Sequence, residues 1–247
     1  MTLKINNATY TEILESGRVS FTLSNLPAGA YDAIIIYDGG LNHNNESKSI
    51  KFNVFKLNAV IVAFDKSYVI NYGGKYSITL KDEKGSVFAG QRVTFTLNGK
   101  AMGSAVTDAK GVATIALTAN MLKAAKAGNK NLIVKLTSSN YQATKTVKIT
   151  VSKEKTKIAA KKKTFKKAQK VKKYTITLKN SKGKAVKKVQ VTLKVKAKTF
   201  KAKTNAKGKA IFKIKKLTKK GTFKAKITFK GDNYYLKTTK NVKIIIK

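Results

Sequence analysis

Apolar and polar residues alternate with a period of two over much of the chain. Threonine or lysine separates aliphatic and aromatic residues at 191–195 and 223–229, and the same period recurs in Val242, Ile244 and Ile246. Successive side chains of a β-strand point to opposite faces, so each run predicts a strand with one buried face. Only 119–127 has a helical character, and it predicts a single turn within a loop. We therefore expect an almost all-β protein.

Turn residues separate these runs. Gly17, Gly111 and Gly208 each follow polar residues and precede a new alternating run. Glycine adopts the positive φ that a tight hairpin turn requires. Short strands separated by such turns are typical of an antiparallel sandwich.

Segments of the chain recur at a spacing of about 95 residues, the length of one immunoglobulin-like domain. The recurring pairs are YSITLKDEKG (76–85) with YTITLKNSKG (174–183), TDAKG (107–111) with TNAKG (204–208), and KTVKITV (145–151) with KNVKIII (240–246). The repeats predict three domains, at 1–57, 58–152 and 153–247, called repeat one, repeat two and repeat three below.

Repeat one is the shortest copy. Residues 31–37 match 223–229 position for position, and 14–23 resemble the region around Gly111. In repeat two, 53 residues precede Gly111, whereas only 16 precede Gly17, so repeat one is expected to lack about 37 residues of its beginning. We predict tandem immunoglobulin-like antiparallel β-sandwich repeats, the first incomplete. The inner face left without complementary strands would comprise Phe21, Leu23, Ile35, Phe52 and Val54.

Charge is distributed unevenly along the chain. Its 53 Lys and Arg and 11 Asp and Glu give a formal net charge of +42, made up of 0 in repeat one, +9 in repeat two and +33 in repeat three. Because so many like charges on one small domain repel one another, they suggest a polyanionic partner. A solvated face in a lysine-biased protein is the alternative.

The lysines of repeat three alternate with apolar residues, as at Lys194 and Lys196, and also crowd its loops. The candidate polyanion contacts are Lys161, Lys162, Lys163, Lys166, Lys167, Lys170, Lys172, Lys173, Lys215, Lys216, Lys219 and Lys220. The chain has only two arginines, Arg18 and Arg92, and neither lies in repeat three. Lysine is a point charge without bidentate base recognition, so specific nucleic-acid binding is not expected. An anionic cell-wall polymer or glycan fits better, with non-specific nucleic-acid binding as the alternative.

Residues for catalysis are scarce. The chain has no cysteine and one histidine, His43 in a loop, so neither a Ser/His/Asp relay nor a histidine or cysteine metal cluster can be assembled. Asp82 and Asp108 precede turn glycines, where a carboxylate bonds nearby amides, and we favour that role over a calcium site. Tyr76 and Tyr174 open alternating strands, which favours a buried ring with a wet hydroxyl over a glycan-stacking surface. We expect no enzyme, cofactor or metal.

Several segments resemble the bacterial-type immunoglobulin-like repeats of adhesin-like surface proteins, particularly those of methanogenic archaea. They are YGGKYSITLKD (72–82), TDAKGVATIAL (107–117), FKGDNYY (229–235) and the closing VKITV-type strand. The resemblance implies a sandwich of about seven strands, location at the cell surface, and a spacer or interaction role towards a host or neighbouring-cell ligand. It supplies no catalytic residues.

The residues after Met1 have no signal-peptide pattern, and no apolar stretch is long enough to span a membrane. We therefore expect a fragment of a longer surface protein. The competing hypothesis is an intracellular protein that binds nucleic acid through the same lysines.

Overall fold

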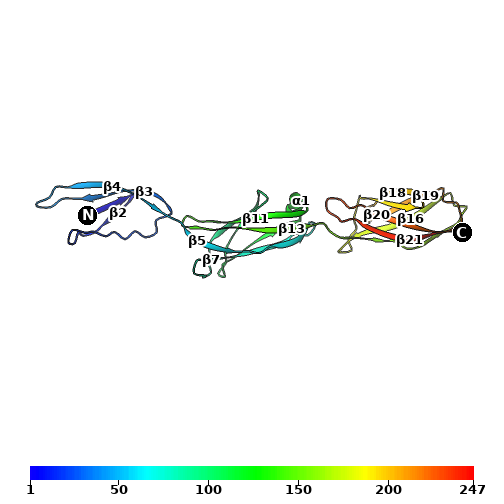
Figure 1. Ribbon diagram of the computed structural model, residues 1–247, viewed down its shortest axis with the longest axis horizontal. Helices are drawn as coiled ribbons and strands as arrows, with labels where there is room; N and C mark the ends of the chain where they lie inside the picture. Colours follow the sequence, from blue (N-terminus) through cyan, green and yellow to red (C-terminus); the bar gives the residue numbers. More distant parts are fainter. The chain divides into compact units, whose positions relative to one another are not determined.

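A computed structural model describes all residues from Met1 to Lys247 and confirms the all-β prediction with 21 strands and one helix (Figure 1). Two compact units make up the chain: one comprises 1–64, 77–115 and 132–147, and the other comprises 65–76, 116–131 and 148–247. The units do not coincide with the boundaries expected at 57/58 and 152/153, so the three domains stay a prediction.

Repeat one forms a single antiparallel sheet. Its strands are β1 (Thr2–Ile5), β2 (Ala8–Thr11), β3 (Gly29–Tyr37) and β4 (Glu46–Val54), in the order β2-β1-β3-β4. The core is small, because only Leu3, Ile5 and Ala33 are buried in it. Residues of the predicted inner face, Phe21, Leu23, Ile35 and Phe52, pack against these three and remain partly exposed, and Val54 is half-buried.

The alternating run after Gly17 is not a strand, which corrects the prediction. Residues 19–28 carry no strand, although a bridge joins Glu15 to Arg18 around Gly17. In repeat three the matching segment, β19 (Lys209–Lys215), is paired along its length with β16 (Val171–Asn180). No strand lies beside 19–28 in that way, so its backbone lacks the ladder that would order it.

The next part of the chain contributes two sheets, in the orders β10-β7-β5-β12 and β6-β13-β11-β8-β9. Their strands are β5 (Leu57–Val62), β6 (Lys66–Val69), β7 (Gly74–Asp82), β8 (Arg92–Leu97), β9 (Lys100–Val106), β10 (Val112–Leu117), β11 (Gly128–Thr137), β12 (Tyr141–Gln142) and β13 (Thr144–Ser152). The helix α1 (Ala119–Ala125) has seven residues, about two turns rather than the single turn expected. The Thr118 hydroxyl caps it by accepting from the Met121 amide.

Repeat three is a sandwich of two sheets, in the orders β14-β16-β19 and β15-β21-β20-β17-β18, drawn from yellow to red in Figure 1. Its remaining strands are β14 (Thr156–Ala159), β15 (Lys163–Phe165), β17 (Gln190–Val195), β18 (Lys198–Lys203), β20 (Gly221–Phe229) and β21 (Thr238–Ile246). The predicted inward residues do form its core: Leu193, Ile227 and Phe212 from the two sheets are fully buried together. Aligned sheets with this strand order form an immunoglobulin-like sandwich.

The turns at Gly111 and Gly208 explain why glycine is needed there. Both have φ near +70°, and a Cβ atom would lie 2.7 Å from the Leu80 carbonyl oxygen at Gly111 and 2.6 Å from that of Leu178 at Gly208. Those carbonyls belong to the neighbouring strands β7 and β16. At Gly17 nothing lies within 4 Å of such an atom. The close approach is therefore a property of the complete sandwich.

The turn carboxylates do what the sequence predicted. Asp108 Oδ1 accepts from the amides of Lys110 and Val112, both at 2.9 Å, and Asp82 Oδ1 accepts from the Ser86 amide. Repeat three builds the matching turns with neutral side chains. Asn205 Oδ1 accepts from two amides at 2.9 and 3.0 Å, and Asn180 does the same in its turn. Repeat three thus keeps the turn geometry without the negative charge.

Candidate polyanion-binding surface

Most of the candidate lysines gather at one end of the repeat-three sandwich. β16 begins at Val171, which pairs with Lys215 at the end of β19, and β20 begins at Gly221, opposite Ile246. The loops 166–170 and 216–220 therefore share this end. The end lysines are Lys166, Lys167, Lys170, Lys215, Lys216, Lys219 and Lys220, and all are exposed.

Four other candidates lie elsewhere. Lys161, Lys162 and Lys163 are exposed where the chain crosses from one sheet to the other, beside a hollow of about 460 Å³. Lys173 projects from the outer face of β16, directly opposite Lys213 on β19. These positions are compatible with contact to a large ligand, but the structure does not bring them together with the end lysines.

The prediction that Lys172 is a surface contact is wrong. Its side chain is 1% exposed, and its amine donates to the Gln169 carbonyl at 2.6 Å and the Lys167 carbonyl at 3.4 Å. Because these acceptors are backbone groups of its own loop, the ammonium closes that loop from inside. Lys172 is a structural residue.

A second cationic surface, absent from the candidate set, covers the outer face of β17, β20 and β21. Lys194 pairs directly with Lys226, and Lys224 pairs directly with Lys243. These four residues, the outer-face lysines, line a groove of about 670 Å³ with Lys196 and Asn241. Directly opposed residues of neighbouring strands have Cβ atoms about 5 Å apart, and like charges there are destabilising. Sequence alternation indicated exposed lysines but not which of them face each other.

Neither acidic residue of repeat three neutralises these lysines. Glu154 is 1% exposed, and its carboxylate accepts from Asn71 at 2.8 Å, from Ser181 at 2.9 Å and from the Tyr72 hydroxyl. Asp232 accepts from the amides of Tyr234 and Tyr235, each at 2.8 Å. The Glu154 carboxylate thus accepts hydrogen bonds at the start of repeat three, and the Asp232 carboxylate accepts them within the β20–β21 loop.

Two surface lysines instead bind carbonyl or aromatic groups. Lys198 donates to the Lys216 carbonyl at 3.0 Å, and the Lys196 amine lies 4.5 Å from the centroid of the Phe223 ring. Such contacts orient an ammonium group but leave its charge uncompensated. The cationic field therefore reaches solvent.

The tyrosines that open strands β7 and β16 have buried rings, as predicted, since Tyr76 and Tyr174 are each 2% exposed. The Tyr174 hydroxyl is not wet, however, because it donates to the Lys161 carbonyl at 2.6 Å. Burial raises its pKa. Burial, followed by the neighbouring Tyr76, raises the pKa of Tyr68 to about 12. These rings belong to the core and offer no glycan-stacking platform.

His43 is exposed in a tight turn, where its amide and carbonyl both bond Gly40. The structure brings together no group of three His, Cys, Asp or Glu side chains suited to hold a metal ion. The one helix has neither the length nor the apolar character that a membrane crossing requires.

No protein-family model matches the chain, and no curated protein matches it by sequence. Solved structures are similar in part. A structure of a 1.5-MDa bacterial ice-binding adhesin shares 15% identity over 100% of this chain and 86% of its own, with a TM-score of 0.33. Invasin, a bacterial integrin-binding protein, shares 18% identity over 78% of this chain and 40% of its own, at 0.44. Titin domains A168–A170 share 9% over 76% and 65%, at 0.45.

Proposed function

We propose that this chain is part of the adhesin-like proteins found at the outer surface of the cell. In this proposal the immunoglobulin-like repeats are spacer and interaction modules, and repeat three binds an anionic cell-wall polymer or glycan. The observation that carries it is the unbalanced charge of repeat three, because Glu154 and Asp232 are both held by structural hydrogen bonds. The end lysines and the outer-face lysines then have only an external polyanion, or salt, to neutralise them.

Binding of this kind would be driven by release of counterions and would weaken steeply with salt. The test is retention of the full chain on purified cell envelopes at low and at high salt. We expect retention at low salt that is lost at high salt. Retention that ignores salt, or none at all, would contradict the docking role.

Nucleic acid is a polyanion like the proposed cell-wall ligand. Binding to nucleic acid is therefore a second outcome that the test must distinguish. Repeat three has no arginine, and its exposed sheet faces have no row of aromatic rings on which bases could stack. Non-specific binding to nucleic acid at low salt is compatible with the proposal. Sequence-selective binding that persists at about 200 mM salt would replace it.

A further inference from the structure

Two of the outer-face lysines, Lys224 and Lys243, occupy positions at which a lysine or its neighbour is compensated elsewhere in the chain. In repeat one, β3 and β4 pair in the same register as β20 and β21, which places Asp32 opposite Lys51 where repeat three has Lys224 opposite Lys243. The Lys51 amine lies 3.4 Å from an Asp32 carboxylate oxygen. Repeat one therefore has an ion pair where repeat three has two like charges.

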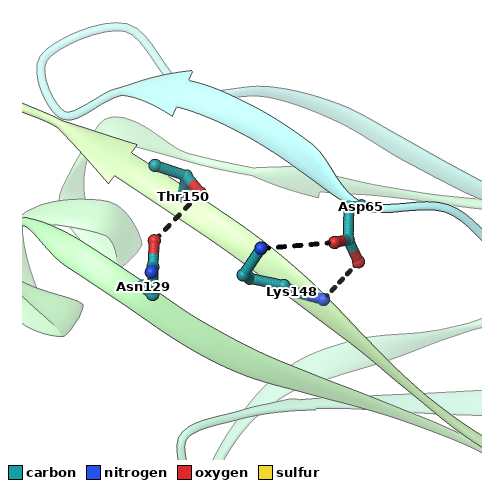
Figure 2. Close-up of polar contacts among 4 residues, drawn as sticks. All are labelled: Asp65, Asn129, Lys148 and Thr150. Atoms are coloured by element: carbon teal, nitrogen blue, oxygen red, sulfur yellow. Dashed lines mark hydrogen bonds and ion pairs between the residues drawn. The ribbon is translucent and has the colours of Figure 1, made fainter.

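Repeat two compensates the same lysine by a different route. Lys148 of β13 occupies the position of Lys243, because KTVKITV aligns with KNVKIII. Its amine lies 3.8 Å from Asp65, and its backbone amide donates to the same carboxylate at 2.7 Å (Figure 2). Figure 2 also shows a separate hydrogen bond between Asn129 and Thr150, with no drawn contact from either residue to the Lys148–Asp65 pair.

Repeat three reverses the charge at the position of Asp65 too. β6 and β15 each pair in parallel with the last strand of their repeat, so Lys66 and Lys163 are equivalent, opposite Ile149 and Ile244. The preceding residue is Asp65 in repeat two and Lys162 in repeat three. Both acidic partners that the other repeats supply have thus become lysine, on an unchanged strand framework.

The spacing of these charges defines the ligand. Lys224 and Lys226 are two residues apart on one strand, about 7 Å, and each faces another lysine about 5 Å across the sheet. A linear phosphodiester chain offers one charge in every short repeating unit. A glycan with one carboxylate in each disaccharide would leave alternate lysines unmatched. The lysine ammonium is also a point-charge ligand well suited to phosphate.

The uncharged members of the surface argue against nucleobases. The groove includes Asn241 and Val242, and the neighbouring Phe223 ring is half-buried against the core beneath Lys196. No aromatic face is free there to stack a base. The surface therefore offers no contact that would favour a ligand with nucleobases.

We propose that the outer face of β17, β20 and β21 in repeat three binds a linear phosphodiester polymer without bases, such as a polyol phosphate. The inference rests on the proposed function and specifies its site and ligand class. The outer-face lysines supply the principal contacts, and the end lysines add only a diffuse field.

The test uses the full chain and poly(glycerol phosphate) of defined length, with affinity measured calorimetrically between about 50 and 200 mM salt. Lys224→Asp recreates the ion pair of repeat one and should engage Lys243. We expect binding at low salt to weaken by at least about tenfold and the slope of log K against log salt to fall by about 1 to 2. The midpoint of thermal unfolding should not fall, because the substitution relieves a repulsion.

Lys213→Asp is the matched control. It makes the same change in net charge on the other sheet, where Lys213 also lies directly opposite a lysine, Lys173. We expect its affinity for the polymer to change by less than about threefold. Equal weakening by both variants would overturn the assignment of the site and leave the proposed function standing.

Two further ligands complete the test. Hyaluronate should bind more weakly than poly(glycerol phosphate) at equal charge number, and oligothymidylate should bind no more tightly. Equal or tighter binding of hyaluronate would overturn the phosphate assignment, and tighter binding of oligothymidylate would overturn the exclusion of bases. Failure of the chain to bind any of these polymers at low salt would remove the proposed function itself.

Discussion

Repeats two and three build corresponding strands from closely similar core residues, yet they treat charge in opposite ways. Repeat two closes its turns with the carboxylates of Asp82 and Asp108, whereas repeat three uses Asn180 and Asn205 in the same hydrogen bonds. The ion pair of Lys148 also has no counterpart in repeat three. The comparison teaches that the inner residues and turn acceptors define the sandwich, while the net charge of its surface varies independently.

The largest effect should come from the turn glycines, which test whether the framework is shared. Gly111→Ala and Gly208→Ala each place a Cβ atom within 2.7 Å of a strand carbonyl at positive φ, and we expect each to destabilise its own repeat by about 3 kcal/mol. Gly17→Ala, with open space around it, should cost only about 1 kcal/mol. Urea unfolding, monitored in each repeat by amide exchange, measures the change in unfolding free energy for all three variants. Equal costs at Gly17 and Gly208 would contradict the role of the neighbouring strand.

A smaller effect is expected at high pH from Tyr68 of repeat two, whose position in repeat three holds Phe165. The native state holds the Tyr68 proton more tightly than the unfolded state, because its pKa is raised from 10.0 to about 12. Stability from this group is therefore complete below pH 10 and is lost as the pH rises towards 12. Ultraviolet titration should detect a tyrosine with that pKa.

Tyr68→Phe is the control for this titration. It should remove the late-titrating group and cost about 1 kcal/mol, because the Tyr68 hydroxyl donates to the Lys75 carbonyl at 2.8 Å. Phe165 occupies the matching position of repeat three, so the ring alone is accommodated by the sandwich. Persistence of the late titration in the variant would assign it to another tyrosine.

Salt should act on repeat three more than on repeat two. Raising the ionic strength from about 0.01 to 0.15 M shortens the screening length from about 30 to 8 Å, which weakens repulsion among the lysines. Amide exchange should slow severalfold in β17 and β20 and change little in β8. A uniform response along the chain would mean that the lysine charges do not strain repeat three.

The smallest effect should come from restoring the carboxylates. Asn180→Asp and Asn205→Asp keep an acceptor oxygen where two amides already donate, so we expect stability to change by less than about 0.5 kcal/mol. Thermal unfolding measures this directly. A large loss would show that the amide side chain has a role beyond accepting these bonds.

The strands of repeat three were predictable because Leu193 and Ile227 keep their alternation, and the turns were predictable because Asp108 stands three residues before a glycine. The missing strand at 19–28 was not, since its absence depends on a pairing partner that local sequence does not reveal. Burial of Lys172 could have been foreseen. It shares the inward phase of Tyr174, Ile176 and Leu178 on β16, a signal that outweighs the usual exposure of lysine.

The outer-face lysines escaped prediction for a different reason. Their exposure follows from alternation, but their direct opposition follows from strand register, as for Lys224 and Lys243. Comparing the repeats would have found Lys224 and Lys243, since Asp32 and Lys51 hold opposite charges at the same two positions. The candidate set instead favoured loops, where lysine density is high but no fixed spacing exists.

The parallel pairing of β15 with β21, the last strand of repeat three, has a mechanical consequence. β15 lies parallel to β21, with Lys163 beside Ile244 and Phe165 beside Ile246. Tension between the two ends of the repeat would pull these strands along their axes in opposite directions, so their hydrogen bonds would be loaded together in shear rather than broken one after another. A module pulled from its two ends would resist extension through this short patch of parallel sheet.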